Sequence, residues 1–152
     1  MINMNIIRDV LNNFVNDDDT DSDTILLIYL FGSVLNSILD IASDIDLAFL
    51  LKSDEYRRDP IYTSYPAYHI ASNIGIKLNK KTDVIILNSS SLEIAYEIIK
   101  TGTCVYKCDV DFQLEYEAKI RGMYFDFKPF LLDLRAKRLK SIMRETADEI
   151  GR

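Results

Sequence analysis

Two short apolar runs, residues 24–31 and residues 44–51, set the strongest limit on how this chain can fold. The first reads TILLIYLF, a continuous β-favouring run that is typical of a strand buried on both faces. The second reads DIDLAFLL and is predicted to be a strand as well. Strands of this kind need helices packed on them, so we expect an α/β layer fold built around one sheet.

The rest of the chain alternates helical and strand patterns around these two runs. Helices are expected at residues 2–14, at 34–39 and at about 64–78, with Pro66 in the first turn of the last.

Two further strands are expected, at residues 82–87 and 103–106. The helix between them is predicted to open at a capping box of Ser90 and Glu93 and to end before Gly102. Residues 111–145 read as helical, with Pro129 kinking or dividing them. All 152 residues are predicted to form a single domain, with this last segment packed on it.

Three aspartates interrupt the apolar strands. Asp44 and Asp46 are two positions apart, so their side chains are expected on the same face of the second strand. Two adjacent carboxylates repel each other unless a cation lies between them, and Mg²⁺ is a cation that carboxylates bind. Asp83 opens the third strand, where it could join the pair. Three carboxylates on two strands would hold two metal ions roughly 3.5–4 Å apart, a spacing used in phosphoryl transfer.

A Gly-Ser pair supplies the other half of the predicted site. Gly32 and Ser33 directly follow the first strand and precede a predicted helix. Glycine lets the backbone approach a phosphate closely, and the amides that open a helix favour an anion. Gly32-Ser33 is followed by ten residues and then by Asp44-Ile45-Asp46. At this spacing the two elements together predict a site for a nucleotide and a metal ion.

Composition excludes several other functions. The net charge of −6 argues against non-specific nucleic-acid binding. The longest apolar run is too short to cross a bilayer, and the N-terminus has no pattern of a secretory signal. Cys104 and Cys108 are expected to be free thiols, and the protein is expected to be cytoplasmic.

The motif Gly32-Ser33, ten residues, Asp44-x-Asp46 resembles that of the DNA polymerase β-like nucleotidyltransferase superfamily. The short chain is similar to the MntA-type minimal nucleotidyltransferases, which are antitoxins of HEPN toxins. Residues 82–85, 98–106 and 124–132 also resemble segments of that family. The resemblance implies a nucleotidyltransferase fold: a central mixed four-stranded sheet flanked by helices, with a C-terminal helical extension.

The same resemblance implies an activity and a partner. A member of this family would transfer AMP from ATP to a tyrosine of a HEPN ribonuclease toxin and so neutralise it. Gly32 and Ser33 would hold the triphosphate, and Asp44 and Asp46 would ligate two Mg²⁺ ions. Asp83 would ligate one ion and help to deprotonate the attacking hydroxyl.

Other functions remain open from the sequence. Many relatives carry an Arg-Gly pair where this chain has Asn36 and Ser37, so the protein could instead neutralise its toxin by binding and masking it. A nucleotidyltransferase of small molecules such as aminoglycosides is a third hypothesis. A basic cluster near the C-terminus is either a solvated helix face or a surface for the toxin or RNA; it comprises Arg135, Lys137, Arg138, Lys140 and Arg144.

Overall fold

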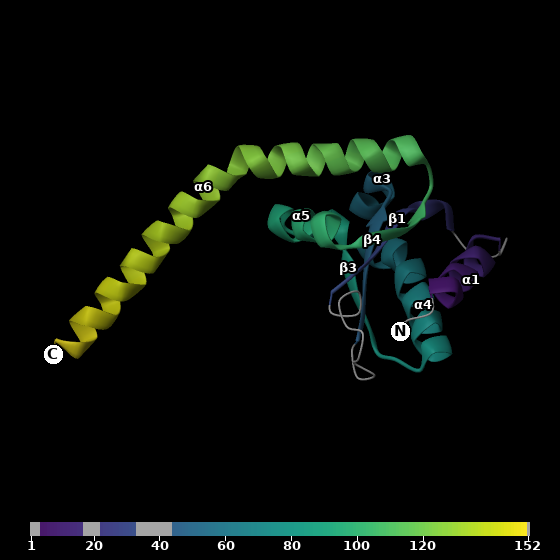
Figure 1. Ribbon diagram of the computed structural model, residues 1–152, viewed down its shortest axis with the longest axis horizontal. Coiled ribbons are helices and arrows are strands. Elements are labelled where there is room, and N and C mark those ends of the chain that lie inside the picture. The colour runs from purple at the N-terminus through teal and green to yellow at the C-terminus, as the bar shows by residue number, and fades with distance from the viewer. Residues whose placement is uncertain (1–3, 17–21, 33–43, 152) are drawn as a thin grey trace.

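The computed structural model describes residues 4–16, 22–32 and 44–151. Within them, four strands form one mixed sheet in the order β3-β2-β1-β4 (Figure 1). Strand β1 (Ile25–Phe31) pairs antiparallel with β2 (Ile45–Leu51) and with β4 (Thr103–Lys107). Strand β3 (Thr82–Ile86) runs parallel to β2. The predicted mixed four-stranded sheet is therefore confirmed.

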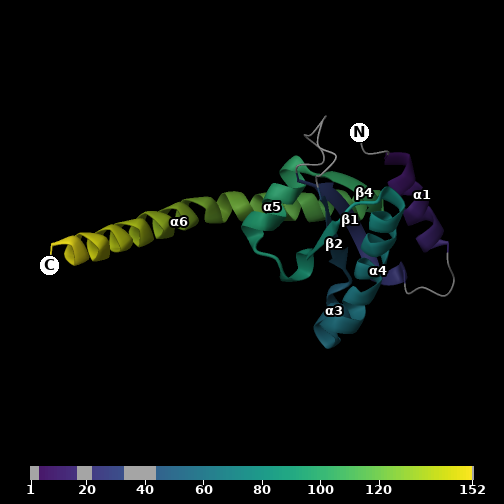
Figure 2. The same cartoon turned by 90° about the horizontal axis from the view of Figure 1, so that it is seen from below.

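Helices cover both faces of the sheet, as Figures 1 and 2 show. On one face, α1 (Met4–Val15) and α4 (Pro60–Leu78) pack against residues such as Ile28, Leu47 and Phe49. On the other face, α5 (Leu92–Thr101) and the start of α6 (Val110–Ile150) pack against Leu27 and Leu50, among others. Two apolar clusters thus bury the two central strands from both sides, which confirms the prediction for β1.

The connection from β2 to β3 differs from its prediction. A short helix, α3 (Ser53–Arg58), precedes α4, and α4 begins at Pro60 rather than near residue 64. The side chain of Asp59 accepts a hydrogen bond from the Tyr62 amide and caps α4, and Pro60 occupies its first turn. Pro66 therefore lies inside the helix, so its predicted place in the first turn was wrong.

The start of α5 also differs from the prediction by one residue. Ser91, not Ser90, is the N-cap, and its hydroxyl accepts a hydrogen bond from the Ile94 amide. The hydroxyl of Ser90 donates to the Leu87 carbonyl instead and closes the short turn that follows β3. The predicted end of the helix is confirmed, because Gly102 is its C-cap.

The C-terminal segment forms one long helix, α6, which contains Pro129. Figure 1 shows α6 running along the domain, bending partway along its length and then projecting away from it. A proline inside a helix removes one backbone hydrogen bond and kinks the axis, which agrees with one of the two predicted outcomes. We call residues 130–150 the α6 arm. The predicted helix at residues 34–39 lies outside the described residues.

None of the helices in the described ranges is long and apolar enough to span a membrane.

Candidate functional site

The site begins where β1 ends. Gly32 has a φ angle of +84°, a left-handed conformation that glycine adopts without a steric cost. A Cβ atom added to Gly32 would overlap the Asp46 carboxylate and would lie 3.1 Å from the Asp46 Cγ atom. The predicted glycine turn and the predicted acidic pair are therefore in direct contact.

Strand register brings the second and third carboxylates together. Asp46 lies opposite Phe31 in the antiparallel pair and opposite Asp83 in the parallel pair. The Ile45 amide donates a 2.9 Å hydrogen bond to the Lys81 carbonyl, which fixes this register at the very start of β3. Asp44 immediately precedes β2, two residues before Asp46. All three aspartates thus lie at one end of the sheet.

Their neighbours on the same strand show which face the acids share. Ile45 and Leu47 are completely buried in the cluster beneath α1 and α4. Ala48 and Leu50 point to the opposite face, beneath α5 and α6, and Asp46 shares their alternation along the strand. Asp46 is half-buried and Asp83 is exposed, so solvent reaches the site.

The electrostatics of Asp46 reflect this crowding. Burial raises the pKa of the Asp46 carboxyl above its ordinary value, and the nearby carboxylates of Asp83 and Asp44 raise that pKa further. Asp83 and Asp44 are therefore close enough to Asp46 to oppose the ionisation of its carboxyl group. Such an arrangement favours a bound cation when all three are charged, and oxygen ligands of this kind suit Mg²⁺.

The carboxylates do not form a complete set of ligands for a metal ion. In the part of the chain that the structure describes, no three His, Cys, Asp or Glu side chains are grouped tightly enough to hold an ion as they stand. Mg²⁺ commonly keeps several waters and also binds substrate phosphates, so a site with few protein ligands is compatible with it. The liganding roles of Asp44, Asp46 and Asp83 remain predictions.

Basic residues occur at both ends of the sheet. Lys80 and Lys81 directly precede β3, at the same end as the aspartates. Lys52 and Arg57 follow the other end of β2, more than about 20 Å away along the strand, and are paired with Glu55 and Asp54. Of these four basic residues, Lys80 and Lys81 are therefore the two that lie at the same end of the sheet as the aspartates. Ser33, Asn36 and Ser37 lie outside the described residues.

A buried polar contact beside the site was not foreseen. The Tyr29 hydroxyl donates a 2.9 Å hydrogen bond to the Glu117 carboxylate, joining the centre of β1 to α6. Burial raises the pKa of Tyr29 strongly, and the hydrogen bond from its hydroxyl to Glu117 adds to this effect. Gln113 and Arg121 also bond to Glu117. Tyr29 looked like an ordinary core residue in the sequence, because its partner is 88 positions away.

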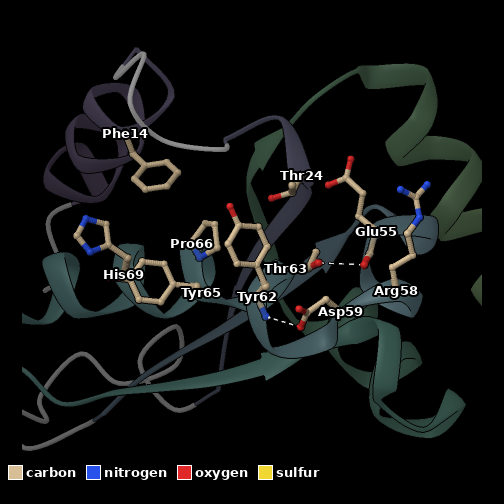
Figure 3. A pocket seen from close by; sticks show the side chains of 10 residues that line it. All are labelled: Phe14, Thr24, Glu55, Arg58, Asp59, Tyr62, Thr63, Tyr65, Pro66 and His69. Carbon is tan, nitrogen blue, oxygen red and sulfur yellow. Dashed lines mark hydrogen bonds between the residues drawn. The ribbon is translucent and has the colours of Figure 1, made fainter.

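A hollow of about 720 Å³ lies elsewhere, between α1, α3 and α4 (Figure 3). Thr24, which directly precedes β1, lines it, whereas Gly32 follows the opposite end of that strand. The aromatic rings of Tyr65 and His69 stack at its edge, and Phe14 contacts the same histidine. None of the predicted site residues that the structure describes lines this hollow.

Comparison of the sequence with known protein families gave a match. A family model described as polymerase beta, nucleotidyltransferase, matches residues 14–111. A search of curated proteins found no significant match.

Several solved structures share the fold. A chain in the toxin–antitoxin MntA–HpeT, in a double mutant with two aspartates replaced by glutamate, is 20% identical with a TM-score of 0.58. A toxin–antitoxin structure with AMP-PNP is 22% identical with a TM-score of 0.56. A complex of tri-AMPylated Shewanella oneidensis HEPN toxin with MNT antitoxin is 19% identical with a TM-score of 0.54. Each match covers 88% of this chain and 99% of the other.

The family match spans β1, the glycine turn, all three aspartates and the rest of the sheet. The chain therefore belongs to the polymerase β nucleotidyltransferase family.

Proposed function

We propose that this protein is an antitoxin that transfers AMP from ATP to a tyrosine of a HEPN ribonuclease toxin. The observation that carries the proposal is the convergence of Gly32, Asp46 and Asp83 at one end of the sheet in a chain of this family. Two of the structural relatives support it: one contains AMP-PNP, and another pairs an AMPylated HEPN toxin with an MNT antitoxin.

The proposed reaction assigns a role to each acid. The tyrosine oxygen of the toxin attacks the α-phosphorus of ATP, the bond from that phosphorus to the β-phosphate oxygen breaks, and pyrophosphate leaves. Asp83 accepts the proton of the tyrosine hydroxyl. It is the most exposed of the three acids, so an incoming protein can reach its carboxylate. Gly32 and Ser33 hold the phosphates through backbone amides and a hydroxyl.

Asp44, Asp46 and Asp83 would hold Mg²⁺, which neutralises charge on the phosphates and polarises the reacting oxygens. The crowding of three carboxylates fits such an ion, because their mutual repulsion is relieved when it binds. We place Lys80 and Lys81 at the outer phosphates, since they precede β3 at this end of the sheet.

The test is transfer of label from α-labelled ATP to the HEPN protein in the presence of Mg²⁺, with mass spectrometry to locate the modified residue. Asp44→Asn and Asp46→Asn are each expected to lower the transfer rate on the order of 100-fold or more. Asp54→Asn is the matched control, because Asp54 is exposed and follows the far end of β2. Undiminished labelling in both site variants would refute the assignment of these acids.

Masking of the toxin without chemistry is the second candidate. Asn36 and Ser37 replace an Arg-Gly pair of many relatives, and the described residues contain no ready-made metal cluster. The triple variant Asp44→Asn, Asp46→Asn, Asp83→Asn separates the two candidates. Inhibition of the ribonuclease by this variant at a one-to-one ratio would favour masking, whereas loss of inhibition would favour AMP transfer.

A further inference from the structure

Pro129 and the α6 arm that follows it carry a largely apolar seam, in which Thr146 is the one polar residue. The seam residues follow alternating spacings of three and four, the repeat that brings two helices together in a coiled coil. Every one of them is exposed, including Leu139 at 60% and Met143 at 63%. They are Pro129, Leu132, Ala136, Leu139, Met143, Thr146 and Ile150.

The seam is long enough to bind a helix. Residues 129–150 extend for about 33 Å as a helix, and Figures 1 and 2 both show the arm projecting away from the sheet. Arg135, beside the seam, pairs with Glu93 of α5, and beyond that contact another helix can lie along the arm. Because the spacing repeats every seven residues, the occupant that matches the seam is a helix with the same repeat.

The charged residues beside the seam indicate which helix could bind to it. Asp133 and Lys140 flank the seam on one side, and Lys128 and Glu149 flank it on the other. In an antiparallel pair of identical helices, residues on the same side face each other across the interface. If Ala136 of one arm packs against Leu139 of the other, Asp133 faces Lys140 and Lys128 faces Glu149. Each of these attractive pairs occurs twice by symmetry.

We propose that the α6 arm binds the α6 arm of a second copy of this chain in an antiparallel coiled coil. Leu132 then packs against Met143 of the second copy, and Pro129 against Thr146. Asp133 already pairs with Lys137 of its own helix at 2.9 Å, and Lys140 of the second copy would approach the same carboxylate. The two nucleotidyltransferase domains lie at opposite ends of the paired arms.

A parallel pair is less favourable in the same terms. Parallel arms would bring Lys128 of one copy to Asp133 of the other, a single attraction, and they would place Arg135 beside Lys140, a residue of the same sign. Arg135 pairs with Glu93 of its own chain, which reduces this repulsion but leaves the parallel pair with one attraction instead of two. In the antiparallel pair both attractions remain, and Arg135 faces the uncharged Ile142. The charge pattern therefore selects the antiparallel arrangement.

The first test measures the mass of the full-length protein by sedimentation equilibrium over a range of concentrations. Wild-type protein is expected to be dimeric. Leu139→Glu places a charge in the seam and is expected to raise the dissociation constant by about tenfold or more. Ser141→Glu adds the same charge on the face of the arm away from the seam, so this control is expected to stay dimeric. Circular dichroism checks that both variants keep their helix content.

The second test exchanges the charges. Lys140→Glu places a second acid opposite Asp133 and is expected to weaken the dimer, and the double variant Asp133→Lys, Lys140→Glu is expected to restore it. A parallel dimer would not show this rescue, because these two positions do not face each other in that arrangement.

Three outcomes would overturn the proposal. The first is a wild-type protein that stays monomeric at concentrations on the order of 0.1 mM, the range of weak complexes. The second is a dimer that Leu139→Glu leaves intact, which would place the contact elsewhere. The third is a monomer that loses binding to the HEPN protein upon Leu139→Glu, which would make a toxin helix the occupant of the seam. The proposal does not rest on AMP transfer, so the labelling assay tests that function separately.

Discussion

The Asp46 carboxylate lies so close to Gly32 that position 32 has no room for a side chain. The positive φ angle of Gly32 turns the chain out of β1, and the space that a side chain would occupy is already filled by the Asp46 carboxylate. The residue is thus restricted both by its backbone and by its neighbour. The sequence predicted a glycine turn here for access to a phosphate, but the contact with Asp46 could not be read from the spacing alone.

Gly32→Ala is expected to lower the free energy of unfolding by about 1–3 kcal/mol, because alanine is strained at this φ angle and its methyl group displaces Asp46. Gly122→Ala is the control: it lies in α6 with nothing within 4 Å of the added methyl group. That substitution is expected to gain about 0.5–1 kcal/mol from helix propensity. Urea unfolding measures both, and an equal effect at the two glycines would contradict the assignment.

Asp46→Asn is expected to stabilise the metal-free protein at neutral pH. Burial and the two neighbouring carboxylates raise the pKa of Asp46, so the folded state disfavours its ionised form. This destabilisation is absent well below the ordinary pKa of 3.8 and develops as pH rises through the raised pKa. The melting temperature of Asp46→Asn in EDTA should therefore exceed that of wild type at pH 7 and match it near pH 3. A variant that melts lower at pH 7 would show that the carboxylate is stabilising.

At the scale of elements, the two central strands were predictable and their neighbours were only partly so. Continuous apolar runs identify β1 and β2 because buried central strands need apolar residues on both faces. The parallel pairing of β2 with β3 cannot be recognised from the sequence of either strand, because it depends on the helices that connect them. The place of Asp83 opposite Asp46 was accordingly a hypothesis until the register was known.

The helix starts show a second limit. Ser90 and Ser91 both satisfy the local rule for an N-cap, and two prolines could each open α4. In the structure, the Leu87 carbonyl engages the Ser90 hydroxyl, and Asp59 caps the helix that begins at Pro60. Hydrogen bonds between residues three positions apart therefore distinguish the helix starts that the cap residues alone leave open.

At the scale of the whole molecule, α6 sets the shape. Its first part is held to the domain by the bond from Tyr29 to Glu117 and by the stack of Tyr96 on Tyr124, whose ring centroids are 3.8 Å apart. Beyond the bend, Arg135 pairs with Glu93 of α5, and the remainder of the helix projects into solvent (Figure 1). The proline is the one feature of the sequence that indicated this division.

Pro129→Ala is expected to straighten α6 and to increase the maximum dimension of the molecule, because alanine restores the missing backbone hydrogen bond. A straight helix of 41 residues extends about 62 Å. Small-angle X-ray scattering measures the change, in the Leu139→Glu background so that pairing of the arms does not mask it. Ser141→Ala in that background serves as the control, and identical scattering curves for the two variants would place the cause of the bend elsewhere.

The parallel pairing of β2 with β3 has a consequence for the order in which the molecule folds. The two strands can meet only after α3 and α4 have crossed over between them, so their contact is long-range and slow to form. A slip of one residue in this pairing would turn Asp83 to the opposite face of the sheet. The acidic cluster is thus completed only in chains whose third strand, β3, has docked in the correct register, and a divalent cation that binds there would select those chains from the misfolded ones.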